Sequence, residues 1–267
     1  MIRRLRTGRG HGVYVTIVEE TLRELYVANI GGGIWHMMKK ETADTFIVDG
    51  TDRGGRVFVD ELGAVLAQAQ PPWPEIDLIG HSTGAVYILN LLKHVEECSS
   101  DPDHDWPDDF SFRSVVFLAP ACDFAVFEEA LRERRHLFSD FRLFAMRDEV
   151  EKKDSLVPGL YPRSLLYFVS GVVEREPDQT TSFDHPIVGM ERYFRNRKVY
   201  NQIEIENARH FLAESARHVV WSIEADRGDG LRSNSTSHVG FDDTDSDDPA
   251  KHTTMQSVQH LIRHGPA

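Results

Sequence analysis

The sequence predicts an α/β fold with a mostly parallel sheet flanked by helices. From residue 76 onward, short runs rich in β-branched residues alternate with helical patterns, as they do in proteins with parallel sheets. The strand-like runs are almost wholly apolar, which is typical of strands buried on both faces. The 267 residues suffice for one large domain, so we expect a single domain over residues 1–267.

Each element after residue 75 is predicted from its pattern of apolar residues. The expected strands, which are short apolar runs, cover residues 76–79, 114–119, 141–146 and 218–224. The expected helices, which show apolar residues at three- and four-residue steps, cover residues 83–95, 124–138, a segment from Pro162 to Val172, a short stretch around 187–194, and 253–263. Gly265-Pro266 then ends the last helix.

The first 75 residues give a weaker pattern. Residues 13–18 (VYVTIV) predict a strand, and residues 55–70 predict a helix. Residues 45–48 fit either a strand or a β-rich connection, and the glycines at 31–33 predict a turn before a helix over 34–40. Later in the chain, we interpret residues 175–217 as a lid or insert and residues 226–252 as a polar loop.

Composition excludes several classes of protein. The net charge of −13 would repel a phosphate backbone, so we expect no nucleic-acid partner. The only cysteines are Cys98 and Cys122, which gives no disulfide framework and suits a cytoplasmic location. No apolar run approaches the roughly 18 residues of a membrane span, and no apolar segment of the kind found in secretory signals follows the arginines at positions 3–9.

Residues 80–84 read Gly-His-Ser-Thr-Gly, which matches the pattern G-x-S-x-G. The motif directly follows an expected buried strand and directly opens an expected helix, which is the context of a nucleophile elbow. Glycines suit both flanks because a Cβ there would meet the neighbouring strand and helix. We therefore expect Ser82 to be a nucleophile, with the backbone N–H of Thr83 as an oxyanion donor at the helix N-terminus.

A serine nucleophile needs a base and an acid that orients the base. In this architecture the chain order is serine, then acid, then histidine. Asp148 lies two residues beyond the third expected strand and is our first choice of acid, with Asp154 and Glu149 as alternatives.

The histidine should follow the last strand and precede the last helix. His238, in the segment STSHVGFDD, meets this condition, whereas His210 and His185 precede the last strand and His252 adjoins the last helix. We therefore predict His238 as the general base. His81, next to the nucleophile, is expected to shape the elbow rather than to transfer a proton.

Several segments make the chain resemble the α/β-hydrolase superfamily from about residue 76 onward, and more narrowly a bacterial group of uncharacterised α/β hydrolases. These segments are GHSTG at 80–84, FLAPA at 117–121, SLLYFVS at 164–170, MRD at 146–148 and SHVGFDD at 237–243. The resemblance implies Ser82 as nucleophile, Asp148 as orienting acid and His238 as general base. It specifies the superfamily and not the substrate.

The N-terminal stretch departs from the pattern of the superfamily, which has a further strand and an oxyanion loop, often His-Gly, well before the elbow. His11-Gly12 is one candidate for this loop, although MIRRLRTGRG before it is a poor strand. The glycines at 31–33 are the other candidate. Gly12 is therefore a candidate for the second oxyanion donor. Loss of one such donor costs about 2.7–4 kcal/mol in the barrier.

Other signals fail on inspection. The aspartates from Asp101 have the first spacings of a calcium loop, but Trp106 stands where glycine is needed and Phe112 where glutamate is needed. No cysteine–histidine spacing suits structural zinc, and no Walker loop or dinucleotide fingerprint occurs. We therefore expect no metal and no cofactor.

These observations predict a serine hydrolase of the carboxylesterase or lipase type, acting on a small-molecule acyl substrate. One alternative is a non-catalytic α/β-hydrolase-like binding or interaction module, which the incomplete N-terminal pattern favours. Another is a thioesterase or amidase with the same triad. The sequence does not specify the acyl-chain size or the oligomeric state.

Overall fold

The computed structural model describes residues 12–24, 27–69, 71–174, 184–244 and 247–265. Its centre is a four-stranded sheet in the order β1-β2-β3-β4, in which every neighbouring pair is parallel. The strands are β1 (Asp77–His81), β2 (Phe112–Leu118), β3 (Phe138–Met146) and β4 (Val219–Ser222). The α/β class and the parallel sheet predicted from the sequence are thus confirmed.

Most residues of the two central strands are buried in the core. Phe117 of β2 and Phe141 of β3 are almost fully buried, and their rings meet edge to face with centroids 5.5 Å apart. Phe127 of α6 (Phe124–Arg134) packs on both rings, and Phe211 of α10 (Ile203–Glu214) packs on that of Phe141. This aromatic cluster joins the sheet to two helices that lie far apart in the chain.

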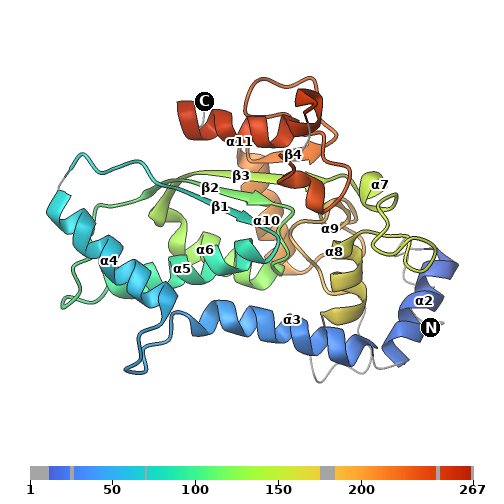
Figure 1. Ribbon diagram of the computed structural model, residues 1–267, viewed down its shortest axis with the longest axis horizontal. Helices are drawn as coiled ribbons and strands as arrows, with labels where there is room; N and C mark the ends of the chain where they lie inside the picture. The colour runs from blue at the N-terminus through green and yellow to red at the C-terminus, as the bar shows by residue number, and fades with distance from the viewer. Residues whose placement is uncertain (1–11, 25–26, 70, 175–183, 245–246, 266–267) are drawn as a thin grey trace.

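Helices cover both faces of the sheet (Figure 1). The helices α5 (Thr83–Ser99) and α6 lie below it in this view, and α11 (Thr253–His264) lies above it. The long helix α3 (Val27–Asp44) packs against α5, as does α4 (Gly54–Ala69). The carboxyl end of β1, where the elbow motif begins, therefore leads directly into a helix of the lower layer.

The expectation for residues 13–18 was wrong, because these residues lie in helix α2 (Val13–Glu24). Val15 and Glu19 are buried four residues apart, whereas Val13 and Ile17 are exposed, which is a helical pattern. Residues 13–18, five of which are β-branched, suggest a strand, but the longer window with Glu19 and Leu22 follows the 3.6-residue period.

The turn expected at residues 31–33 was also wrong, since these glycines lie inside α3 rather than in a turn before it. Gly32 explains part of this difference, because a Cβ on it would lie 3.2 Å from the carbonyl oxygen of Val173. The glycine lets α3 approach the π-helical turn η2 (Val169–Val173) closely. Residues 45–48 form no strand but a turn and a connection to α4.

The remaining segments are short. In the interpreted insert 175–217, the described part contains α9 (Glu191–Arg195) and α10, and residues 175–183 lie outside the described residues. The expected polar loop at 226–252 includes the 3-10 turns η3 (Val239–Phe241) and η4 (Pro249–His252). The other short helices are η1 (Arg135–Leu137), α7 (Asp148–Glu151) and α8 (Leu165–Phe168).

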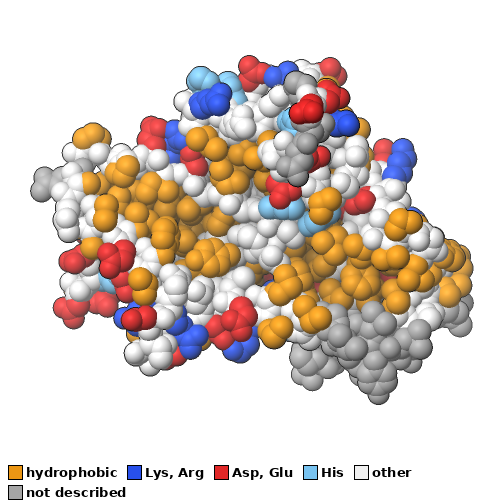
Figure 2. Space-filling view, in the orientation of Figure 1, with side chains coloured by type: hydrophobic (Ala, Val, Ile, Leu, Met, Phe, Trp, Pro, Cys, Tyr) orange, Lys and Arg blue, Asp and Glu red, His pale blue; other side chains and the backbone are white. Residues whose placement is uncertain are grey.

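Apolar side chains gather in two areas of the face shown in Figure 2, one over α4 and β1 and one toward α2. The exposed hydrophobic residues of these elements include Phe58 of α4, Ile79 of β1 and Tyr14 of α2. Ile79 is accessible because β1 is an edge strand of the described sheet. Among the described helices, none combines the length and the apolar character needed to cross a bilayer.

Candidate active site

The turn from β1 to α5 holds Ser82 in a left-handed backbone conformation, with φ of 55° and ψ of −116°. Non-glycine residues rarely adopt such values, which are found at functional turns. Two backbone hydrogen bonds fix the turn to the end of β2. The N–H of Ser82 donates to the carbonyl of Leu118 at 2.9 Å, and the N–H of Ala121 donates to the carbonyl of Ser82 at 3.1 Å.

The two glycines of the motif differ in what they contribute. A Cβ on Gly80 would lie 2.7 Å from the backbone of Gly84, so the strand can approach the helix only because residue 80 is glycine. A Cβ on Gly84 would meet no atom within 4 Å. The steric reason expected for both glycines therefore holds for Gly80 and not for Gly84.

The structure brings Ser82 and His238 together, with Oγ of Ser82 2.9 Å from Nε2 of His238. The hydroxyl donates to Nε2 when the imidazole carries its proton on Nδ1. His238 is only 4% exposed. Burial, and secondarily the nearby His81, lower the pKa of His238 to about 3. The ring is therefore neutral at ordinary pH and can accept a proton.

The other ring nitrogen of His238, Nδ1, is buried and has no hydrogen-bond partner within the described part of the chain. In a serine–histidine–acid site this atom donates to the orienting carboxylate. The carboxylate of Asp154 does contact this residue, since its Oδ2 accepts from the backbone N–H of His238 at 3.1 Å. Asp154 thus touches the histidine residue at its backbone rather than at its ring.

Asp148, our first choice of acid, has other partners. The hydroxyl of Tyr167 donates to its Oδ1 at 2.6 Å, and the ammonium of Lys152 donates to its Oδ2 at 2.5 Å. Among the described residues, no hydrogen bond joins Asp148 to His238. The alternative Glu149 is exposed on α7. Of the three candidate acids, the structure therefore places Asp154 against His238 and leaves Asp148 in a separate network.

Four buried hydroxyls, which the sequence reasoning missed, hold the loop that carries His238. Ser222, at the end of β4, donates to the carbonyl of Ser235 at 2.5 Å. Ser235 in turn donates to the carbonyl of Gly240 at 2.9 Å, and its Oγ lies 2.8 Å from that of Thr254 in α11. Ser233 contacts the same threonine at 2.9 Å. The dense run of hydroxyl residues at 233–237 was the signal in the sequence.

His81 links the elbow to the same loop. Its Nε2 lies 3.0 Å from the carbonyl oxygen of His238, and its Nδ1 lies 3.3 Å from Oδ2 of Asp242. The rings of His81 and His238 lie with centroids 5.0 Å apart. The expectation that His81 shapes the elbow is compatible with these contacts.

The two expected oxyanion donors occupy different places. Thr83 is the first residue of α5, so its N–H has no acceptor within the helix, which suits the role of an oxyanion donor. Gly12 lies just before α2, where its carbonyl accepts from Thr16. Figure 1 shows α2 at the side of the molecule, away from the β1–α5 turn. The structure therefore does not place Gly12 beside Ser82.

Two clusters in the described chain have the residue types of a metal site. In the first, which consists of Asp60, Cys98 and His104, Nε2 of His104 lies 3.1 Å from Oδ1 of Asp60. The N–H of Trp106 donates to Nδ1 of His104, so Nε2 carries the ring proton and offers no lone pair to a metal.

The second cluster consists of Asp123, Glu174 and His185. The carboxylate of Glu174 already accepts from Trp35 and Lys39, and Asp123 caps α6 by accepting from Val126. Both carboxylates of this cluster are thus engaged with protein donors.

A cleft of about 520 Å³ lies beside the His238 loop. It is lined by Val150, Lys153, Asp154, Ser155, Ile223, Thr236 and Ser237. This volume falls within the range of roughly 300–1,000 Å³ that is usual for small-molecule sites. Because Asp154 lines it, the cleft adjoins the candidate catalytic residues, although Ser82 and His238 are not among the lining residues.

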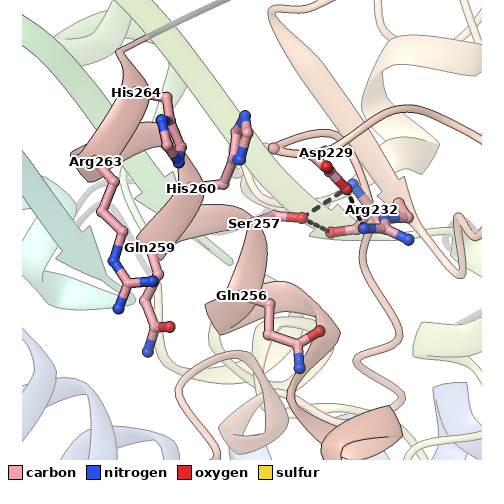
Figure 3. Close-up of a pocket in the computed structure, with 9 residues that line it drawn as sticks. Asp229, Arg232, Gln256, Ser257, Gln259, His260, Arg263 and His264 are labelled. Carbon is pink, nitrogen blue, oxygen red and sulfur yellow. Dashed lines mark hydrogen bonds and ion pairs between the residues drawn. The ribbon is translucent and has the colours of Figure 1, made fainter.

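A second pocket, of about 210 Å³, contains Ser257, His260 and Asp229 (Figure 3). The hydroxyl of Ser257 donates to the carbonyl of Arg232 at 2.8 Å and accepts from its N–H at 3.1 Å. Asp229 forms an ion pair with the guanidinium of Arg232. Figure 3 shows Ser257 and Asp229 directed toward Arg232, with His260 apart from them. This pocket therefore lacks the serine–histidine contact found at Ser82.

Comparisons with known proteins identify no relative. A scan against protein-family models, a search of curated proteins and a search of solved structures each return no match to this chain. The resemblance to the α/β-hydrolase superfamily therefore stays a prediction, and the functional argument depends on the geometry of the site.

Proposed function

We propose that the protein is a serine hydrolase that cleaves an ester or related acyl bond of a small molecule. The observation that supports this most is the contact of 2.9 Å between Oγ of Ser82 and Nε2 of His238 at a strained strand-to-helix turn. A neutral, buried histidine beside a serine hydroxyl is the arrangement needed for nucleophilic attack on a carbonyl.

In this proposal Oγ of Ser82 attacks the acyl carbon, and its proton moves to Nε2 of His238. The N–H of Thr83 donates to the oxyanion that forms. His238 then returns the proton to the leaving oxygen as the bond to the acyl carbon breaks, which leaves an acyl-enzyme on Ser82. Water attacks this ester, His238 takes its proton, and the acid product departs while the proton returns to Ser82. The reaction as written needs no metal or cofactor.

Asp154 is our candidate for the orienting acid. It already contacts the backbone of His238, and Nδ1 of the ring is buried without a described partner. In this proposal the carboxylate of Asp154 turns from the backbone N–H to accept from Nδ1. Asp148 is the less favoured candidate, because it would first have to leave Tyr167 and Lys152.

We place this activity in the cytoplasm, where free thiols are stable. Cys98 and Cys122 are both buried and unpaired with one another. The net charge of −13 argues against a nucleic-acid substrate.

A non-catalytic binding module is the second candidate function. The specific observation in its favour is the unpartnered Nδ1 of His238, because a site selected for catalysis pairs this atom with an acid. Under this alternative the cleft beside Asp154 would hold a ligand without reacting with it.

Labelling with a fluorophosphonate probe separates the two candidates. We expect the purified protein to bind one probe per chain, and the variants Ser82→Ala and His238→Ala to lose labelling while keeping their circular dichroism spectrum. Ser257→Ala, which removes the serine of the second pocket, is the matched control and should keep labelling. A folded wild-type protein that does not react would favour the binding module. A panel of p-nitrophenyl esters, thioesters and anilides then distinguishes esterase from thioesterase and amidase.

A further inference from the structure

Two side chains hold the backbone of His238 from opposite sides. Asp154 accepts from its N–H at 3.1 Å, and His81 lies 3.0 Å from its carbonyl oxygen through Nε2. These two contacts fix the backbone N–H and the carbonyl of His238. The backbone therefore constrains the direction of the side chain toward Ser82, although Nδ1 itself has no described partner. Of these two residues, Asp154 is the candidate orienting acid, whereas His81 takes no part in the proposed reaction.

The partners of His81 restrict its proton positions. A backbone carbonyl accepts but never donates, so Nε2 of His81 must carry a proton to bond His238. Nδ1 faces Oδ2 of Asp242 at 3.3 Å, and an ionised carboxylate also only accepts. A neutral imidazole can satisfy one of these oxygens, whereas the doubly protonated ring satisfies both. The contact with Asp242 therefore fixes the ring plane of His81.

Through these contacts, His81 connects strand β1 to the loop that carries His238. As the last residue of β1 it directly precedes Ser82, and both of its partners lie in the loop at residues 238–242. The strand that carries the nucleophile is thereby tied to the loop that carries the base. A shift of this loop relative to β1 would move Nε2 of His238 away from Oγ of Ser82.

We propose that His81 is a positioning residue, which acts by donating from Nε2 to the carbonyl of His238 and is itself held by Asp242. The proposal rests on the proposed function, because the geometry that it protects is the Ser82–His238 contact. The charged groups next to the two histidines are Asp242, which faces the ring of His81, and Asp154, which accepts from the backbone N–H of His238. Misplacement of a catalytic group by about 1 Å can cost 100-fold in rate.

Two substitutions separate the two contacts of His81. In His81→Gln the amide nitrogen is three bonds from Cβ, as Nε2 is, so it can still donate to the carbonyl of His238. In His81→Asn the amide nitrogen is two bonds from Cβ, as Nδ1 is, so it can reach Asp242 but not the carbonyl. We expect His81→Gln to react with the fluorophosphonate within about threefold of the wild-type rate, and His81→Asn to react about 10- to 100-fold more slowly.

A second readout does not depend on reaction. In protein labelled with ¹⁵N-histidine, nuclear magnetic resonance reports which ring nitrogen of His238 carries the proton. We expect the proton on Nδ1 in the wild type and in His81→Gln, and a mixture of both tautomers in His81→Asn. His81→Gln removes the ring that lowers the pKa of His238, so it should raise the pH midpoint at which His238 becomes protonated. Asp242→Asn keeps the bond to the carbonyl and removes a negative charge, so it should not raise this midpoint. Asp247→Asn, an exposed aspartate in the same acidic segment, is the matched control.

These outcomes distinguish the inference from the proposed function. If Ser82 of the wild type reacts and His81→Asn matches the wild type in rate and tautomer, the positioning role is overturned and the hydrolase proposal stands. If no serine reacts but the tautomer of His238 still depends on residue 81 as described, the positioning role stands and the hydrolase proposal fails. Folding of each variant is checked by its thermal transition.

Discussion

Oγ of Ser82 lies 2.9 Å from Nε2 of His238, although 156 positions of the chain separate the two residues. The contact depends on parallel strands, because the carboxyl ends of all four strands lie at the same end of the sheet, and the loop after β4 reaches the turn after β1 there. The buried hydroxyls of Ser235 and Thr254 then fix the loop after β4 in the position that brings His238 into contact with Ser82. The pair is thus a consequence of the fold and of a specific polar network.

The choice between the two candidate acids gives the first prediction. Asp154→Asn should lower kcat for an activated ester by about 100- to 10,000-fold, because an amide orients and stabilises the imidazolium poorly. Asp148→Asn should have a much smaller effect, since Asp148 bonds Tyr167 and Lys152 rather than His238. Steady-state kinetics of both variants test this. A larger loss in Asp148→Asn would return Asp148 to the role that the sequence first suggested.

The second prediction concerns pH. The base must be neutral to accept a proton, and burial together with His81 lowers the pKa of His238 to about 3. The labelling rate should therefore stay nearly constant as the pH falls from 8 to below the ordinary histidine value of about 6.5. A pH–rate profile measured with the folded protein checks this. An acid limb centred near 6.5 would show that the ring is more solvated, or more strongly paired, than its contacts indicate.

The third prediction uses the two glycines of the elbow. Gly80→Ala should destabilise the fold by about 1–3 kcal/mol, because its Cβ would lie 2.7 Å from the backbone of Gly84. Gly84→Ala places its methyl group in open space within the first turn of α5, so it should be neutral or stabilise by up to about 1 kcal/mol. Urea unfolding of the two variants measures the difference. Equal destabilisation would contradict the close approach at residue 80.

The fourth prediction concerns the buried acid Glu151. Its burial, opposed by a hydrogen bond from Ser164 and reinforced by Asp154 and Asp148, raises its pKa to about 8. The folded state therefore keeps this proton up to about pH 8, whereas the unfolded state loses it near pH 4.5. Since the folded state binds more protons in this window, stability should fall as the pH rises from about 4.5 to 8.

Glu151→Gln lacks this titration and can still accept from Ser164. The free energy of unfolding of the wild type, minus that of Glu151→Gln, should therefore decrease between pH 5 and 8 and level off above. Denaturant unfolding of both proteins at several pH values gives this difference. A difference that does not vary with pH would show that Glu151 is ionised in the folded protein.

The sheet could be predicted from the sequence because its strands are short apolar runs with few alternatives. The helix α2 could not be predicted in this way, because its first six residues have the composition of a strand. The helical period becomes visible only when the buried positions up to Glu19 are considered. The contact of Ser82 with His238 was expected from chain order and from the position of each residue after a strand.

The acid could not be settled from the sequence in the same way. Asp148 and Asp154 both follow β3 within a few residues, and the short helix α7 between them sends the two carboxylates to different partners. The contact of His81 with Asp242 joins residues whose separation in the chain has no periodic or motif signal. Such contacts depend on how a loop folds back on the sheet, which local patterns do not specify.

The central claim is that Ser82 is an activated nucleophile. Mass spectrometry of the intact protein after treatment with a fluorophosphonate, followed by peptide mapping, tests it most directly. The account predicts a single adduct on the peptide that contains Ser82, and no adduct in His238→Ala. A folded protein that gains no adduct, or one that is modified at another serine, would contradict it.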